Sequence, residues 1–246
     1  MSPRITFAVA TRVLTQIRRD HRTAAMLLVL PCLLMTLLWW MFEDVPNGAV
    51  FDQLGPGLLA LFPFIIMFLV TSVTTLRERS SGTLERLLAM PMGKLDFLVG
   101  YAIAFGVVAA VQSGLAVALS VGLLDLDVQG PVWLLAVVAV ADAVLGSALG
   151  LLVSAFATTE FQAVQFMPAF VVPQILLCGL FVARDQLPSV LERVSDVLPL
   201  SYATDAMQSL VRTSATGDVW RDVGVVAVFA VAALGLGAAT LRRRTP

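Results

Sequence analysis

The chain has 246 residues, of which 59% are hydrophobic and only 13% are charged, and its formal net charge is −1. A soluble domain carries about 25% charged residues, and half that share leaves too little polar surface to cover a globule in water. The composition therefore excludes an ordinary soluble protein and predicts one all-α membrane domain, residues 1–246.

Residues 4–21, before the first apolar run, place Ile5, Val9, Val13 and Ile17 four apart, with arginines on the other faces. This spacing is typical of an amphipathic helix, and the arginines favour a position in the cytoplasmic interface of a membrane. We therefore expect an interfacial helix within residues 1–23, with a plain polar leader as the alternative.

Six apolar runs are long enough to cross a bilayer as helices, which takes about 20 mostly apolar residues. They cover about residues 24–42, 58–76, 97–121, 132–156, 164–182 and 223–241. The first run is too long for a signal-peptide core, and no small-residue cleavage site follows it. Pro168 and Pro173 predict a kink in the fifth run. The runs are continuous and lack barrel-strand alternation, so we expect six transmembrane helices.

Lysine and arginine are unevenly distributed between the loops. One side of the six-span arrangement carries Arg4, Arg12, Arg18, Arg19, Arg22, Arg77, Arg79, Arg86, Lys94, Arg242, Arg243 and Arg244. The other side carries Arg184, Arg193, Arg212 and Arg221, together with the acidic residues Glu43, Asp44, Asp52, Asp125 and Asp127. Cytoplasmic loops hold the excess of basic residues. We therefore expect a multi-pass protein of the cell membrane with both termini in the cytoplasm.

The loop after the second run, residues 77–93, contains a short amphipathic pattern. Thr83 is a plausible N-cap, Leu84, Leu87 and Leu88 share one face, and Pro91 ends the predicted helix. The spacing fits two interpretations equally: a helix that docks on a partner, or a surface helix with a solvated charged face.

A long segment before the sixth run, residues 184–213, carries two further amphipathic patterns. Apolar residues recur at helical spacing over residues 187–198 and 202–211, and Pro199 interrupts between them. Ser201 is the predicted cap of the second helix. Each pattern is too short and too charged to span. We expect a broken external helical hairpin that dips into the outer leaflet or covers an external opening.

Asp142 is the one acidic residue deep inside a run, about 15 Å from Val132 at 1.5 Å per residue. A carboxylate at that depth is costly and should face protein or water. One interpretation is a contact with a cationic substrate; the other is a protonated or internally bonded group that holds helices together. The possible polar partners are Gln112, Ser113, Gln165 and Gln174.

Two aromatic pairs stand four residues apart, Phe64 with Phe68 and Phe166 with Phe170. They could line a cavity for flat apolar drugs, although such rows also serve packing or lipid contact. The substrate-pathway candidates are therefore Asp142, Phe64, Phe68, Phe166, Phe170 and Gln174. Gly146 and Gly150 permit close approach of two helices, and we favour packing within the chain.

Conventional catalytic and metal-binding sets are absent from the sequence. His21 is the only histidine, and Cys32 and Cys178 lie inside apolar runs, where they are predicted to be packing residues. A phosphate-binding P-loop needs Gly-x-x-x-x-Gly-Lys followed by Ser or Thr. The only lysine is Lys94, followed by Leu95. We expect no catalytic residue, metal or cofactor on this chain, so ATP-driven work would need a separate ATPase chain.

The run from Arg77-Glu78-Arg79 through Gly82-Thr83-Leu84-Glu85-Arg86-Leu87-Leu88 to Pro91 resembles the loop signature of ABC-2 type permeases, the membrane subunits of one class of ATP-binding-cassette exporters. Pro199-Leu200-Ser201-Tyr202 resembles a second recurring patch of that family. The order of the predicted parts is also similar over nearly the whole chain. Size and spacing look closest to the daunorubicin and multidrug-resistance permeases.

The resemblance implies that residues 83–88 form the coupling helix that docks on the ATPase. The implied coupling residues are Gly82, Thr83, Leu84, Glu85, Arg86, Leu87, Leu88 and Pro91. The implied partners are two ATPase copies that hold ATP and Mg²⁺, a second permease, identical or related, the lipid bilayer and a small hydrophobic substrate, but no nucleic acid. The expected function is export of hydrophobic drugs or antibiotics. The alternatives are export of a lipid-linked glycan or lipid, and an ATP-independent channel or membrane scaffold.

Overall fold

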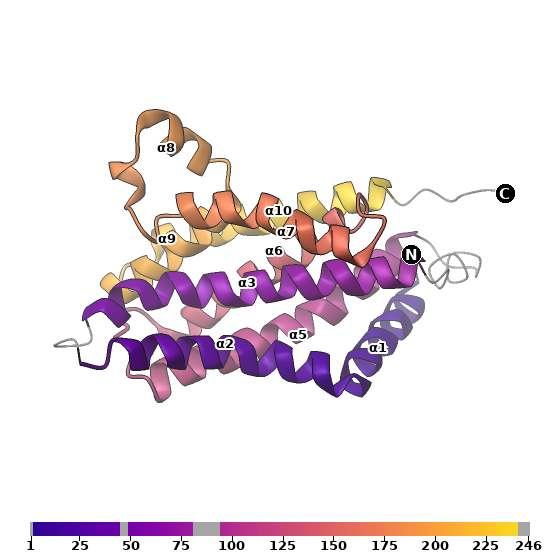
Figure 1. Cartoon of the computed structure of the whole chain (residues 1–246), viewed down its shortest axis with the longest axis horizontal. Helices are drawn as coiled ribbons and strands as arrows, with labels where there is room; N and C mark the ends of the chain where they lie inside the picture. Colours follow the sequence, from indigo (N-terminus) through magenta and orange to yellow (C-terminus); the bar gives the residue numbers. More distant parts are fainter. Residues whose placement is uncertain (1, 45–48, 81–93, 241–246) are drawn as a thin grey trace.

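The computed structural model describes residues 2–44, 49–80 and 94–240, and every regular element in those ranges is helical (Figure 1). The elements are α1 (Pro3–Arg19), α2 (His21–Met41), α3 (Ala49–Ser80), α5 (Lys94–Gly122), α6 (Val132–Val153), α7 (Glu160–Leu177), the 3-10 turn η2 (Arg184–Gln186), α8 (Ser189–Ser195), α9 (Pro199–Arg212) and α10 (Gly217–Thr240).

Among the described residues, five helices are long and apolar enough to cross a membrane, judged by length and composition: α2, α3, α5, α6 and α10. They lie at five of the six expected positions. The helix at the remaining position, α7, runs from Glu160 to Leu177, whereas the expected span was residues 164–182. The six-span arrangement therefore stays a prediction.

The early end of α7 has a local cause. Gly179 has a φ of +87°, the left-handed conformation that commonly ends a helix and that glycine adopts at little cost. Cys178 is the last residue before it and serves as the C-cap. Pro168 and Pro173 lie inside α7, which continues through both. The glycine, rather than either proline, ends this helix.

The centre of the bundle is the contact between α3 and α6. A Cβ atom on Gly146 would lie 2.4 Å from the backbone oxygen of Phe64, and one on Gly150 would lie 2.3 Å from that of Phe68. Only glycine permits such an approach at these two positions. The Gly146-x-x-x-Gly150 pair thus serves packing within the chain, as we favoured from the sequence.

One end of the bundle, the α1 end, is crossed by α1, which joins α2 through Asp20 (Figure 1). The apolar face of α1, with Val9, Val13 and Ile17, is buried in a core cluster shared with α5. Val9 packs closely on Gly100, where a Cβ atom would lie 2.7 Å from its Cγ1. The predicted amphipathic helix is present, but most of its apolar face contacts protein. An interfacial position in a membrane stays a prediction.

The opposite end, the α9 end, carries α8 and α9. The predicted N-cap at Ser201 is wrong, because α9 begins at Pro199 after Leu198. Proline is favoured in the first helical turn, since its fixed φ suits a helix and its missing N–H is not needed there. The buried face of α9 includes Leu200, Met207 and Leu210. By contrast, α8 projects from the bundle in Figure 1.

Candidate functional site

The eight expected coupling residues, Gly82, Thr83, Leu84, Glu85, Arg86, Leu87, Leu88 and Pro91, lie outside the described residues. The structure does describe the helix ends on either side. Glu78 is in the last turn of α3, and Asp96 is in the first turn of α5. The structure therefore contains both flanks of the expected coupling segment.

Both flanks are bound by α1. Arg12 donates from Nη2 to Oε1 of Glu78 at 3.1 Å, and the Glu78 side chain is only 5% exposed. The backbone N–H of Ser2 and the hydroxyl of Thr6 both donate to Oδ1 of Asp96, at 2.7 and 3.2 Å. One helix thus connects the end of α3 to the start of α5. A displacement of either flank would be transmitted to α1.

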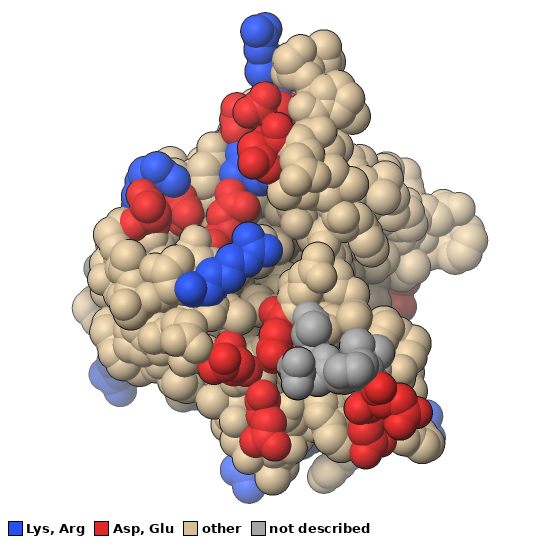
Figure 2. Space-filling model, turned by 90° about the vertical axis from the view of Figure 1, so that its left-hand side faces the viewer, with Lys and Arg blue, Asp and Glu red and all other residues tan. Residues whose placement is uncertain are grey.

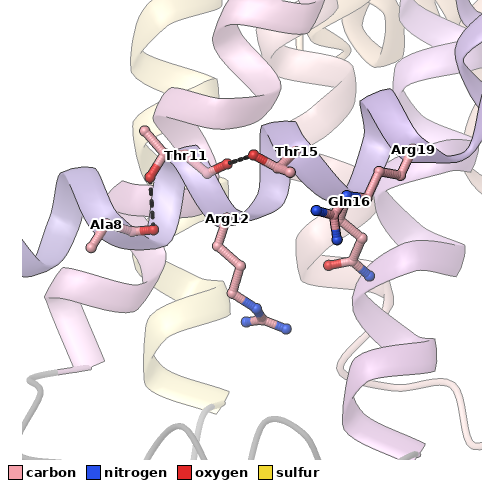
Figure 3. Close-up of a pocket in the computed structure, with 6 residues that line it drawn as sticks. All are labelled: Ala8, Thr11, Arg12, Thr15, Gln16 and Arg19. Atoms are coloured by element: carbon pink, nitrogen blue, oxygen red, sulfur yellow. Dashed lines mark hydrogen bonds between the residues drawn. The ribbon is translucent and has the colours of Figure 1, made fainter.

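The other side of α1 forms an open groove of about 440 Å³ (Figure 3). Its lining residues are Ala8, Thr11, Arg12, Thr15, Gln16 and Arg19. The hydroxyls of Thr11 and Thr15 are occupied by backbone oxygens one turn earlier, of Ala8 and Thr11, at 3.1 and 2.7 Å. Arg12 and Gln16 of this groove both bond to Glu78, so part of its positive charge is already balanced within the chain.

Asp142 is completely buried in α6, and neither of its carboxylate oxygens has a hydrogen-bond partner among the described residues. The side-chain amide of Gln112 on α5 is also buried, and neither its nitrogen nor its oxygen has a hydrogen-bond partner among the described residues. Ser113 donates to the backbone oxygen of Ala139 at 3.1 Å. The described residues therefore supply no hydrogen-bond partner that would explain Asp142 as a structural group, and a buried group without one calls for an explanation.

The aromatic candidates do not form one surface. Phe64 and Phe68 are fully buried in the core, with ring centroids 6.5 Å apart. Phe166 packs against the same core and is partly buried. Phe170 is 46% exposed on α7. The structure thus separates the α3 pair, which faces protein, from the α7 pair, which reaches the surface.

Gln174 links α7 to the start of α9. Its Nε2 donates to the backbone oxygen of Phe170 at 3.0 Å, and its Oε1 accepts from the N–H of Leu200 at 3.3 Å. The first N–H groups of a helix have no partner within the helix, and Gln174 satisfies one of them. Gln174, a substrate-pathway candidate, therefore positions α9 and also lies in the bundle interior.

The sequence interpretation missed a cluster around Arg184. The guanidinium contacts carboxylates on both sides: Nη1 pairs with Oδ2 of Asp205, and Nη2 lies 2.5 Å from Oδ1 of Asp196. It also lies 5.3 Å from the centre of the Tyr202 ring. We call Arg184, Asp196, Tyr202 and Asp205 the Arg184 cluster. The one feature of the sequence that could have pointed to this cluster is the position of Arg184 in a loop on the side that is poor in basic residues.

Burial and charge act against each other in this cluster. Burial raises the pKa of Asp205 above its ordinary value, and the nearby charge of Arg184 offsets part of that effect. Burial also acts to lower the pKa of Arg184, but Asp205 and Asp196 outweigh it and leave the pKa raised. Arg184 therefore stays charged. Removing it would leave the Asp205 carboxylate partly buried without a counter-charge.

Acidic side chains are prominent across the face at the α9 end (Figure 2). On that side, a hollow of about 280 Å³ is lined by Trp39, Phe42, Glu43, Phe51, Asp52, Leu124 and Asp125. The carboxylate of Asp52 accepts the backbone N–H of Asp127 at 3.2 Å. This end of the bundle is thus acidic around its exposed loops, whereas α1 at the opposite end is basic.

The family model for the ABC-2 type transporter matches residues 5–211. The Probable multidrug ABC transporter permease YbhR of Escherichia coli K12 is 27% identical over 190 residues, which cover 77% of this chain and 52% of that protein. The Linearmycin resistance permease protein LnrN of Bacillus subtilis 168 is 23% identical over 186 residues, covering 73% and 48%. ABC transporter G family member 20 of Dictyostelium discoideum is 26% identical over 165 residues, covering 67% and 23%. The matched part spans about half the length of the two bacterial relatives.

Proposed function

The chain belongs to the ABC-2 type transporter family, and we propose that it is the permease subunit of an ATP-driven exporter of hydrophobic drugs or antibiotics. The observation that carries this proposal is the family match over residues 5–211 in a multi-pass helical membrane protein. The names of two relatives, a multidrug permease and a linearmycin resistance permease, support the substrate class.

The proposed topology has six spans, with α7 as the fifth, and both termini in the cytoplasm of a cell-membrane protein. The α1 end then faces the cytoplasm and the α9 end faces outward. The charge distribution supports this orientation, because cytoplasmic loops are enriched in basic residues. Helix α1 carries four arginines and no acidic residue, whereas acidic side chains gather at the α9 end (Figure 2).

The proposed energy source is a partner ATPase that binds ATP and Mg²⁺ and docks on residues 82–91. Two such subunits and a second permease, identical or related, would complete the exporter. The contacts of α1 with Glu78 and Asp96 support this arrangement, since they tie the two flanks of the docking segment to one helix. A movement of the ATPase would reach α3 and α5 together as a rigid-body displacement.

The proposed substrate path runs through the bundle beside Asp142. A buried carboxylate without a partner suits the positive group of an amphiphilic drug. Gln174 and the more exposed α7 aromatics, Phe166 and Phe170, would contact the apolar part. Phe64 and Phe68 are fully buried, so they would reach a substrate only after α3 and α6 separate.

The test is ATP-driven efflux of a hydrophobic cationic dye from cells that express this chain with the ATPase encoded beside its gene. Glu85→Arg should lower efflux about ten-fold while membrane insertion stays normal, because a reversed charge at a docking surface repels its partner. The matched control is Glu43→Arg, the same change at an exposed glutamate outside both the docking segment and α8. Efflux that is unaffected by ATP depletion, or that survives Glu85→Arg unchanged, would contradict the proposal.

A further inference from the structure

The segment of residues 184–198, which we call the lid, is attached to the bundle mainly by polar contacts. Its helix α8 leaves Val190 and Val194 exposed, at 71% and 44%, and Val197, just after α8, is 67% exposed. A helix that buries little apolar surface gains little stability from the hydrophobic effect. Ion pairs and hydrogen bonds therefore decide whether the lid stays on the bundle.

Arg184, the first residue of the lid, makes the connection with α9. It pairs with Asp205 of α9 and, within the lid, with Asp196. The hydroxyl of Tyr202 on α9 donates to the backbone oxygen of Asp196 at 2.8 Å. The Ser195 hydroxyl donates to the backbone oxygen of Leu177 at 2.8 Å. It also lies 3.1 Å from the Ser201 hydroxyl. Polar groups thus fasten the lid at its start, through Arg184, and near its end, through Ser195 and Asp196.

The chain changes direction at Gly179, five residues before the lid. Its φ of +87° is strained for residues with a side chain, and a Cβ atom there would lie 3.3 Å from Cγ of Arg184. Its backbone oxygen accepts from Nε2 of Gln208 on α9 at 3.3 Å. A glycine in this conformation, followed by a short irregular stretch, provides a hinge about which residues 184–198 can move.

Polar groups of the bundle interior lie next to the points where the lid is attached: Cys178 follows Leu177, which binds Ser195, and Thr204 precedes Asp205. The Cys178 thiol is only 1% exposed, lies next to the Thr204 hydroxyl and is within electrostatic reach of Asp142. Thr204 is fully buried, and no oxygen or nitrogen partner is found for its hydroxyl in the described part of the chain. Movement of the lid away from these attachment points would admit water to the Cys178 thiol and the Thr204 hydroxyl.

We propose that Arg184 is the latch of an exit gate: with Asp205 it holds residues 184–198 against α9 and the end of α7, where Cys178 lies, and its release opens the α9 end of the bundle. The word exit rests on the proposed function, because it assumes export toward that end. The closure itself does not, and it can be measured without transport.

The experiment uses the full-length protein in detergent micelles, with Cys32→Ser so that Cys178 is the only thiol. A hydrophilic maleimide should modify Cys178 slowly. Arg184→Gln should speed modification about five-fold, because the loss of the latch raises the population of open lids. Arg193→Gln, at an exposed arginine of α8, is the matched control and should leave the rate unchanged.

Arg184→Lys should restore most of the protection, because a lysine keeps the charge that binds Asp205. If Arg184→Gln does not accumulate, Asp205→Asn replaces it, because it removes the same ion pair from the α9 side and should raise the rate about three-fold. Equal rates in wild type and both neutralised variants would overturn the latch. A latch that passes this test in a protein without ATP-driven efflux would leave the gate standing and count against the exporter.

Discussion

The two ends of the bundle each contain a buried or half-buried arginine–carboxylate pair, but the pairs fasten different kinds of segment. At the α1 end, Arg12 binds Glu78 from a helix whose Val9 and Val13 are already buried against α5. At the α9 end, Arg184 fastens a lid whose α8 valines are exposed. The same chemistry therefore reinforces a fixed helix at one end and decides the position of a loosely held segment at the other.

The difference follows from the size of the two contributions. Burial of a valine or isoleucine contributes about 1.5–3 kcal/mol, and α1 buries several such residues. An ion pair that remains partly exposed contributes about 0–1 kcal/mol. Loss of the ion pair should therefore leave α1 in place but release the lid. Three predictions test this contrast, from the largest expected effect to the smallest.

The largest effect should come from locking the lid. In a chain with Cys32→Ser and Cys178→Ser, the pair Ser195→Cys and Ser201→Cys replaces hydroxyls that lie 3.1 Å apart. Oxidation should join the lid to α9 and abolish efflux, and a reductant should restore it, because α8 could then move again. Either single cysteine variant is the control. Full efflux with the disulfide shown to be formed would exclude movement of the lid from the transport cycle.

The next effect concerns the contact between α1 and α5. Gly100→Ala should lower the free energy of unfolding by about 1–3 kcal/mol, because its Cβ atom would meet Val9 and the backbone oxygen of Thr6. Thermal unfolding in detergent, followed by size-exclusion chromatography, gives the measurement. Gly114→Ala on the same helix has no neighbour within 4 Å and is the control. Equal stability of the two variants would contradict the tight α1–α5 contact.

The smallest effects compare the two arginines directly. Arg12→Met should lower the free energy of unfolding by about 1–2 kcal/mol, because it removes a partner of the buried Glu78 carboxylate. Arg184→Gln should change it by less than about 1 kcal/mol, because only the lid is released. Glu78→Gln added to Arg12→Met should recover part of the loss. A larger loss of global stability at Arg184 than at Arg12 would reverse the contrast between the two ends.

Several features of the fold could be predicted because they depend on local pattern. The long apolar runs predicted α2, α3, α5, α6 and α10, and the four-residue spacing of Val9 and Val13 predicted an amphipathic α1. Gly146 and Gly150 pointed to a close helix contact. Helix ends were less accurate where a single residue decides them. Gly179 ends α7 before residue 182, and Pro199 starts α9 two residues before Ser201.

Less of the candidate site could be predicted from the sequence. Asp142 stood out because an acidic residue within an apolar run is rare, but its lack of a described partner is a property of the packed bundle. The Arg184 cluster had no such local signal, since its carboxylates are 12 and 21 residues away from the arginine. Spacing along one helix cannot reveal which side chains meet between an irregular segment and a second helix.

The sequence by itself determined that this protein is helical, apolar and charged differently at its two ends, because hydropathy, helix period and charge distribution act along the chain. Only the tertiary structure decided what each face contacts. A period of 3.6 residues requires that the apolar face of α1 be buried, but lipid and α5 satisfy that requirement equally well. The close fit of Val9 on Gly100 settles the choice for α5, and the pairing of Arg184 with Asp205 likewise decides where the lid rests.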